Sequence, residues 1–269
     1  MPKVYFVGGL PRAGSTLLMQ ILAQNPAFHS SPTSGLCSLV KAMTQANATN
    51  EEEKSNLRPD EQRKRMQRGV RGLIDGWYSE DIGEARVAFD KGRGWVGQME
   101  MLNHAYGEPP KVLVPIRDLR GILTSAEKLW RSNPEKWQQG DMATVDARCV
   151  NWLSGQSFIG SAAERIKDML HRGHAPDVLF IRMEDLTTNP EPIMKSVYEY
   201  LREPYYSHDF SNVKQATHEH DPVHGIYGDH DIKEGPVRPI PEEWDKYLGA
   251  GLAERIKNDN AWFYQAFYQ

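Results

Sequence analysis

The sequence predicts an α/β protein with three layers, in which helices cover both faces of a central parallel sheet. Three short apolar runs occupy residues 4–7, 111–116 and 178–181, and segments with helical spacing follow them. Strands that alternate with helices in this way pair in parallel, because each helix returns the chain to the edge where the next strand starts. No convincing linker interrupts the 269 residues, so we expect a single domain over residues 1–269.

The first unit is a strand, a glycine-rich loop and a helix. Residues 4–7 read Val-Tyr-Phe-Val, which is apolar and β-favouring, and Gly8-Gly9 ends the run. From Ser15 onward the apolar residues recur with helical spacing, at Leu17, Leu18, Ile21 and Leu22. Asn25-Pro26 then ends the predicted helix.

The segment before the second clear strand is more polar. Residues 30–56 are rich in Ser, Thr, Asn and Glu, which predicts a loop followed by a weak helix, with residues 47–56 the least ordered. Pro59 begins a highly charged helix that reaches Tyr78. Residues 87–89 form a short strand candidate, and residues 95–105 form a helix candidate.

The second half of the chain continues the alternation. We expect helices at residues 119–130, 144–171, 190–201 and 242–267. Residues 203–240 are irregular and rich in His, Pro, Gly and Asp. A loop that carries substrate specificity is the favoured interpretation of this region. The alternative is a metal site at His218-x-His220, Asp221 and His224, but this spacing matches no standard zinc pattern.

Composition excludes several classes of protein. The net charge is −4, whereas a bulk nucleic-acid binder carries a basic surplus. The two cysteines, Cys37 and Cys149, are too far apart for a metal pattern and too few for a disulfide framework. The sequence shows no signal-peptide pattern and no apolar run near the ~20 residues that span a bilayer. We therefore expect a cytoplasmic protein that acts without a membrane or a nucleic acid.

The loop at residues 8–16 is suited to a phosphate-like group. Backbone N–H groups and the positive end of the following helix point at such a ligand. Gly9 and Gly14 have the spacing of a nucleotide-binding P-loop, and Thr16 stands at its Ser/Thr position. Ser15, however, occupies the place of the lysine that reaches the β- and γ-phosphates of a triphosphate. Arg12 supplies a cation within the loop instead; the alternative is a glycine turn that only joins strand to helix.

A second basic site follows the strand at residues 111–116. Arg117 comes directly after it, and Ser125 follows eight residues later. Open α/β sheets bind ligands at such strand ends, and a guanidinium can contact a phosphate with two hydrogen bonds. The alternative is a surface ion pair between Arg117 and Asp118, which would contribute little to stability.

Residues 6–18, from Phe6 to Leu18, resemble the 5′-phosphosulfate loop of sulfotransferases. The Pro11–Thr16 stretch is closest to the Pro-Arg-Ser-Gly-Thr-Thr form of tyrosylprotein sulfotransferases and related bacterial enzymes. The resemblance implies 3′-phosphoadenosine 5′-phosphosulfate (PAPS) as donor, 3′,5′-adenosine bisphosphate (PAP) as product, and no required metal. By position, the donor-binding residues would be Arg12, Ala13, Gly14, Ser15 and Thr16 for the phosphosulfate and Arg117 and Ser125 for the 3′-phosphate.

Three further features extend the resemblance. Residues 181–186, followed by Asn189-Pro190, are similar to a family segment that carries Tyr where this chain has Met183. Arg238 lies where related enzymes place a C-terminal cation over the cofactor. Lys91 follows Asp90 and resembles the lysine of the family's Asn/Asp-Lys pair, which contacts the sulfuryl group.

Sulfuryl transfer needs in-line alignment, cations that neutralise developing charge, and in many cases a base. Arg12 and Lys91 are the candidate catalytic cations. The carboxylate base of the tyrosylprotein enzymes would fall near residues 32–34, where this chain has none. Other candidate bases are His29, Glu100, His104, His218, Glu219, His220 and His224.

The sequence therefore predicts in-line sulfuryl transfer from PAPS to a hydroxyl or amine. The acceptor stays open among small molecules, carbohydrates and peptides. One alternative is a P-loop kinase of a small metabolite, which would require a lysine in place of Ser15. Another is a catalytically degenerate nucleotide-binding module, which would be expected to lose cations such as Arg12, Lys91 and Arg117.

Overall fold

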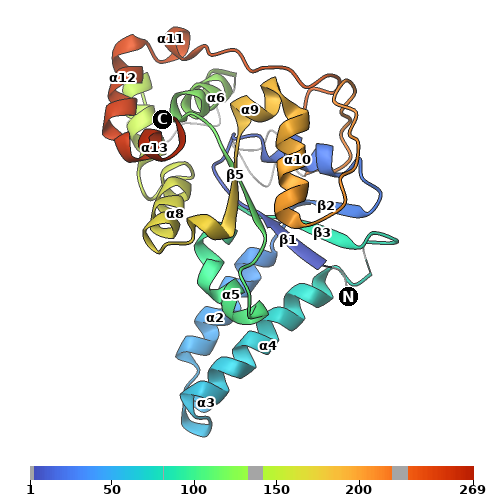
Figure 1. Ribbon diagram of the computed structural model, residues 1–269. Coiled ribbons are helices and arrows are strands. Elements are labelled where there is room, and N and C mark those ends of the chain that lie inside the picture. The colour runs from blue at the N-terminus through green and yellow to red at the C-terminus, as the bar shows by residue number, and fades with distance from the viewer. Residues whose placement is uncertain (1–2, 81, 133–141, 220–229) are drawn as a thin grey trace.

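Five parallel strands form the centre of the protein, in the order β2-β3-β1-β4-β5 (Figure 1). The structure is a computed structural model that describes residues 3–80, 82–132, 142–219 and 230–269. The strands are β1 (Lys3–Val7), β2 (Phe28–Thr33), β3 (Val87–Lys91), β4 (Val112–Ile116) and β5 (Val178–Arg182). The apolar run at residues 4–7 becomes the middle strand because it can bury side chains on both faces.

The two faces of the sheet bury different side chains of β1. Val4 and Phe6 join one apolar cluster, and Tyr5 and Val7 join the other, as expected for side chains that alternate along a strand. Helices on the first face are α4 (Pro59–Trp77), α5 (Met99–Tyr106), α6 (Leu119–Ser132), α7 (Val145–Leu153), α8 (Gly160–His171), α12 (Ala250–Asp259) and α13 (Ala261–Phe267). The second face is covered by α1 (Ser15–Leu22) and α10 (Pro190–Leu201). The predicted three-layer α/β architecture is confirmed.

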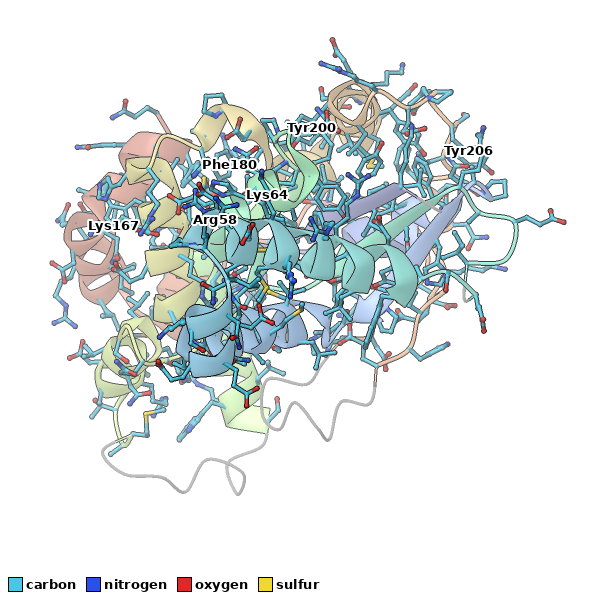
Figure 2. All side chains as sticks on the ribbon, turned by 90° about the horizontal axis from the view of Figure 1, so that it is seen from below. Arg58, Lys64, Lys167, Phe180, Tyr200 and Tyr206 are labelled. Atoms are coloured by element: carbon cyan, nitrogen blue, oxygen red, sulfur yellow. The ribbon has the colours of Figure 1, made fainter. Side chains whose placement is uncertain are left out.

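The remaining helical segments are short, except α2, whose first turns add Leu36, Cys37 and Val40 to the cluster on the first face. They are α2 (Leu36–Thr49), α3 (Glu51–Asn56), α9 (Met183–Thr188), α11 (Trp244–Tyr247) and the 3₁₀ turns η1 (Trp95–Gln98) and η3 (Ala175–Asp177). The lower parts of α2 and α4, together with α3, extend away from the sheet (Figure 1). Seen from below, α4 crosses the front of the molecule, with Arg58 and Lys64 near its beginning (Figure 2). Among the described helices, none has the length and apolar character needed to cross a bilayer.

Two sequence expectations for residues 28–56 were wrong. Residues 28–33, Phe-His-Ser-Ser-Pro-Thr, form the edge strand β2, whereas residues 30 onward were expected to be a loop. A proline argues against a strand in sequence, but Pro32 is tolerated here because β2 lies at the edge of the sheet and has only one partner strand. Residues 47–56 are the end of α2, Asn50 and all of α3, and Asn50 caps α3 by accepting a hydrogen bond from the Glu53 N–H at 3.0 Å.

The long helix expected over residues 144–171 is instead two helices, α7 and α8. The chain turns through Ser154–Ile159, where Ser and Gly are poor helix formers. A Cβ on Gly160 would lie 2.1 Å from the Ser154 carbonyl oxygen, so only glycine fits where α8 begins. The break lets α8 face the loop after β3, with which it forms part of the site described below.

A buried ion pair joins α6 to α7. The Glu127 carboxylate has no solvent exposure and accepts hydrogen bonds from Arg148 Nε at 2.8 Å and Nη2 at 2.7 Å. Arg148 also donates to the Met142 carbonyl oxygen at 2.7 Å. Because both charges are buried, each depends on the other for stabilisation.

Candidate active site

The predicted site residues converge at one edge of the sheet. The loop Gly8–Gly14 follows β1, Lys91 ends β3, and Arg117 follows β4. Met183 follows β5. Because all the strands are parallel, their carboxyl ends lie at the same edge, which is where open α/β sheets bind ligands.

The glycines of the loop are required by close packing. A Cβ on Gly9 would lie 2.3 Å from the Pro115 carbonyl oxygen, so the loop passes directly against β4. Gly14 has φ +82°, and a Cβ there would lie 1.9 Å from Met183 Sδ. The thioether at 183, where the family often has tyrosine, therefore packs against the loop just before α1 begins. The first N–H groups of α1 have no partners within the helix and are placed to bind an anion.

Arg12 is held in a strained backbone conformation at the tip of the loop. Its φ of +59° is left-handed, which costs a non-glycine residue about 1–2 kcal/mol. Arg117 Nη1 donates to the Arg12 carbonyl oxygen at 3.3 Å, and Arg12 Nε donates to Ser125 Oγ at 3.0 Å. The structure thus brings together Arg12, Arg117 and Ser125, which lie up to 113 positions apart in the sequence.

Arg117 and Ser125 line a cavity of about 180 Å³, together with Lys128, Met183 and the segment 240–244. Burial lowers the pKa of Arg117, while the nearby Glu184 carboxylate opposes that shift. Glu184 accepts hydrogen bonds from the Asp118 N–H at 2.9 Å and the Tyr268 hydroxyl at 3.1 Å. The cavity therefore presents a buried, oriented Arg117 guanidinium, although Asp118, Glu184, Glu242 and Glu243 also line it and Glu243 pairs with Lys128.

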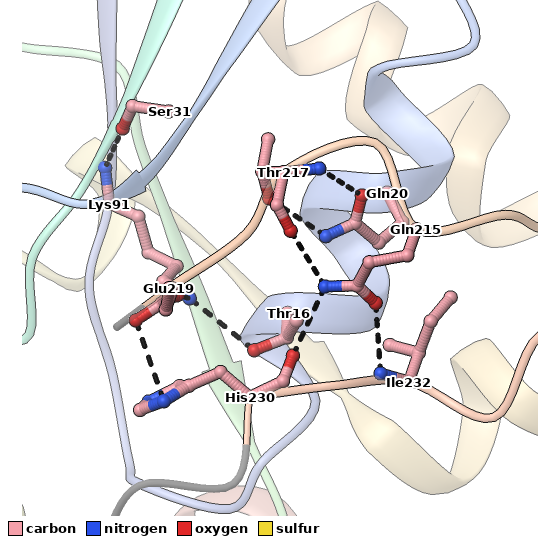
Figure 3. Close-up of polar contacts among 9 residues, drawn as sticks. All are labelled: Thr16, Gln20, Ser31, Lys91, Gln215, Thr217, Glu219, His230 and Ile232. Carbon is pink, nitrogen blue, oxygen red and sulfur yellow. Dashed lines mark hydrogen bonds and ion pairs between the residues drawn. The ribbon is translucent and has the colours of Figure 1, made fainter. Parts of the chain in front are cut away.

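Lys91 lies on the other side of the loop. Its N–H donates to Ser31 Oγ of β2 at 3.1 Å, and its Nζ donates to Thr16 Oγ1 at 3.3 Å (Figure 3). The preceding residue, Asp90, is fully buried and accepts hydrogen bonds from Tyr78 and Trp95, each at 2.6 Å. Asp90 thus anchors the end of β3, and Lys91 points to the opposite side, toward the glycine loop.

Glu219 forms an ion pair with Lys91 (Figure 3). Its side chain is 2% exposed, and its second carboxylate oxygen lies 3.5 Å from His230 Nδ1. Burial is the largest influence and would raise the pKa of Glu219, but the hydrogen bonds from Lys91 and Thr33 and the charges of Lys91 and His230 together lower it. The carboxylate is therefore ionised at neutral pH.

Two glutamines fix the segment that carries Glu219. Gln20 of α1 accepts hydrogen bonds from the Ala216 N–H at 2.6 Å and the Thr217 N–H at 3.2 Å. Gln215 donates to the Thr217 carbonyl oxygen at 2.7 Å and accepts from the Ile232 N–H at 2.9 Å (Figure 3). The segments on either side of residues 220–229 are thereby tied to each other and to α1.

Other predicted residues lie elsewhere. His29 lies on β2, where its ring contacts Tyr78 at a centroid distance of 5.6 Å. Glu100, on α5, is more than half exposed and pairs with Arg172 at 3.0 Å. Glu100 lines neither the cavity of Arg117 and Ser125 nor the smaller one beside Arg12 and Lys91. Arg238 is exposed and precedes Ile240, which lines the cavity of Arg117.

The histidines divide between described and undescribed parts of the chain. The exposed His104 contacts the Glu100 carbonyl oxygen at 2.6 Å, and His218 is exposed. His220, Asp221 and His224 lie outside the described residues. In the part of the chain that the structure describes, no group of three or more His, Cys, Asp or Glu side chains could hold a metal ion.

Comparisons with known proteins identify the family of this chain. A model of the sulfotransferase family matches residues 5–207, which is more than half of the chain. Among curated proteins, no sequence matches this chain.

Solved sulfotransferases share the fold. A sulfotransferase domain from the curacin biosynthetic pathway has a TM-score of 0.52 and 18% identity, over 97% of this chain and 98% of that one. Sulfotransferase STF9 from Mycobacterium avium has a TM-score of 0.53 and 13% identity, over 99% and 77%. A retinol dehydratase in complex with androsterone and the inactive cofactor PAP has a TM-score of 0.50 and 14% identity, over 96% and 80%. At these identities the structures support the fold alone, but the family model identifies the chain as a member of the sulfotransferase family and as a transferase.

Proposed function

We propose that this sulfotransferase uses PAPS as its sulfuryl donor and transfers the group to a hydroxyl or amine. The main observation behind this proposal is that Arg12, Lys91 and Arg117 converge on a glycine loop that lacks the P-loop lysine of kinases. A triphosphate with Mg²⁺ would leave that loop without its usual cation, whereas a phosphosulfate needs only N–H donors and fixed positive charges. The family assignment does not favour the kinase or the degenerate module.

The chain's own groups fit both ends of the donor. We propose that residues 12–16 hold the 5′-phosphosulfate through backbone N–H groups, the Ser15 and Thr16 hydroxyls and the Arg12 guanidinium. Arg117 and Ser125 would hold the 3′-phosphate, because both line the 180 Å³ cavity beside the loop. Arg238 would add a cation near Ile240 on the far wall of that cavity. The solved retinol dehydratase, which contains PAP, is a fold relative consistent with this assignment.

Lys91 and Arg12 would stabilise the transition state. PAPS supplies a sulfuryl group whose leaving group is a phosphate ester, which departs without being protonated. The Lys91 ammonium and the Arg12 guanidinium neutralise the charge that develops on the oxygens as the bond breaks. Both cations are fixed by hydrogen bonds to other residues, so little reorganisation is needed.

We propose Glu219, rather than His29 or Glu100, as the base that accepts the acceptor's proton. Its carboxylate contacts the same Lys91 that would face the sulfuryl group. It is ionised at neutral pH, and the acceptor proton becomes acidic as the new bond to sulfur forms. Glu100 is exposed on α5 and pairs with Arg172, and His29 packs against Tyr78.

The acceptor would be a small molecule, a carbohydrate or a peptide; the solved retinol dehydratase contains androsterone, a small molecule. We also infer that residues 1–269 are one domain, because α13 at the end of the chain packs against β5 of the central sheet: the rings of Phe180 and Phe267 lie 4.8 Å apart. Free, buried Cys37 and Cys149 support a cytoplasmic location.

Thermal unfolding with added ligands tests the donor. Saturating PAP without Mg²⁺ should stabilise the protein by about 2.7 kcal/mol at 100 times its Kd, which corresponds to a rise in Tm of several degrees. Transfer of labelled sulfate from PAPS to a panel of hydroxyl and amine acceptors then tests the reaction. Stabilisation by ATP with Mg²⁺ but not by PAP would overturn the proposal.

A further inference from the structure

A larger cavity adjoins the glycine loop on the side of Lys91. It measures about 730 Å³ and lies between α2, the loop after β3 and α8. It shares Thr33, Gly92, Arg93 and Phe158 with the smaller cavity that Lys91 and Arg12 line. A molecule bound in this cavity would therefore reach the end of β3, where Lys91 lies.

The cavity carries a guanidinium that has no carboxylate partner among the described residues. Arg165 of α8 is half-buried, and its only hydrogen bond within the described ranges goes from Nη2 to Ser161 Oγ at 3.1 Å. Its stem lies across Gly97, where a Cβ would be 3.3 Å from Arg165 Cδ. Burial without an opposing carboxylate lowers the pKa of Arg165.

The charge balance of the cavity favours an anion. Lys41 and Arg93 also line it, and the charges of Arg165 and Lys41 oppose that of Asp90 in their effect on the buried Cys37 thiol, which lines the cavity too. Of the two acidic residues along the wall, Asp168 pairs with Arg172 at 2.9 Å, and Glu164 is exposed. A half-buried cation is costly until an anion binds it, and a charge-assisted hydrogen bond then offsets that cost.

We propose that this cavity binds the acceptor and that Arg165, with Lys41, holds an anionic group of it: a carboxylate, a sulfate or a phosphate. The group that receives the sulfuryl would lie toward Lys91, at the shared end of the two cavities. The inference rests on the proposed sulfuryl transfer and deepens it, because it names the chemical class of the acceptor. Arg165 acts here as a specificity-determining residue.

Matched acceptor pairs test the inference. Phenol, alkyl alcohol, sugar and amine acceptors are each assayed as a carboxylate and as the corresponding primary amide. We expect the carboxylate to have a kcat/KM at least about tenfold higher. Arg165→Gln should lower kcat/KM for the carboxylate by about 10- to 100-fold, mainly through KM, and leave the amide within about twofold.

A matched control separates the cavity from general charge effects. Lys167→Gln removes the same charge from α8 at a position that does not line the cavity, where the Lys167 ammonium lies 5.7 Å from the centre of the Trp262 ring. This variant should leave the preference for carboxylates unchanged. Sulfated and phosphorylated versions of an active acceptor then show which anion Arg165 favours.

The outcomes distinguish this inference from the proposed function. Failure to bind PAP and to transfer sulfate would overturn both. Transfer that uses carboxylate and amide equally, or that Arg165→Gln lowers equally for both, would overturn only the inference. If PAP binds but no panel member is sulfated, calorimetry measures the affinity of the PAP complex for 4-hydroxybenzoate and for 4-hydroxybenzamide. Tighter binding of the carboxylate would support the anion-binding cavity, and equal affinity for the two would refute it.

Discussion

Replacing Glu219 by Gln removes the negative charge that faces Lys91 but keeps the size of the side chain and one hydrogen-bond acceptor. If Glu219 is the base, its loss should lower kcat by about 10²–10⁴-fold, the usual contribution of a positioned base. The affinity for PAP should not fall, because Lys91 would no longer be neutralised by a carboxylate. A drop in kcat without a loss of cofactor affinity is the signature that we expect.

The same change should also destabilise the free protein. The Lys91 and Glu219 side chains are 7% and 2% exposed, so Glu219→Gln removes a carboxylate that pairs with a buried ammonium. Breaking a buried pair costs about 3–5 kcal/mol, and the amide oxygen of Gln, which still accepts a hydrogen bond, should keep the loss near the lower end. Denaturant unfolding measures this difference directly.

The pH dependence of the unfolding free energy tests the contribution of the Lys91–Glu219 ion pair independently. The pKa of Glu219 is lowered below its ordinary value of 4.5, so the ion pair contributes fully above pH 4.5. That contribution is lost as the pH falls through the lowered pKa of the folded state, when the carboxylate becomes protonated. The gap in unfolding free energy between wild type and Glu219→Gln should therefore be constant above pH 4.5 and narrow below it.

Single-turnover kinetics with saturating PAPS separate catalysis from binding, and Glu254→Gln on the exposed face of α12 is the matched control. The reasoning would be refuted if Glu219→Gln kept kcat within a factor of about three of wild type while its unfolding free energy fell. In that case the carboxylate would only stabilise Lys91. A parallel loss of kcat and PAP affinity would show that Glu219 positions the cofactor site.

Three further substitutions probe the site and the core. Arg12→Ala should lower transfer by about 10²–10³-fold, because it removes a cation fixed at the developing charge; kcat measures this, and wild-type activity would contradict the assignment. Arg117→Ala should weaken PAP binding by about 10- to 100-fold in calorimetry, with kcat at saturating PAPS little changed. Glu127→Ala should destabilise the protein by about 3–5 kcal/mol in urea unfolding, because Arg148 is left buried without a counter-charge; a loss below about 1 kcal/mol would show that the pair is not buried in solution.

The sequence alone determined that the protein is built on a parallel sheet and that a glycine loop follows its first strand, the loop that we propose binds the donor. The apolar runs at 4–7, 112–116 and 178–181 identify buried parallel strands because both of their faces are covered. Gly9, Gly14 and Ser15 identify the loop because a close backbone approach needs glycine and a triphosphate would need lysine. Each of these requirements concerns neighbouring residues, so a short segment of sequence is enough to recognise it.

The edge strand and the break between α7 and α8 depended on long-range context. β2 consists of Phe-His-Ser-Ser-Pro-Thr and lacks an alternating apolar pattern, so its pairing with β3 decides its conformation. That pairing brings Ser31 to the Lys91 N–H. Residues 154–159 turn between α7 and α8 although the flanking segments have helical spacing, which places Arg165 over the cavity beside the loop.

Glu219 shows most clearly what only the tertiary structure decided. In sequence it is one of several acidic and histidine candidates in an irregular region, 128 positions from Lys91. Gln20 and Gln215 bring it to the end of β3 through hydrogen bonds to backbone groups, which leave no periodic signal in the sequence. The loop can thus be identified from consecutive residues. The partner of Lys91 depends instead on how distant segments pack, because burial and charge pairing act between residues that only the fold brings together.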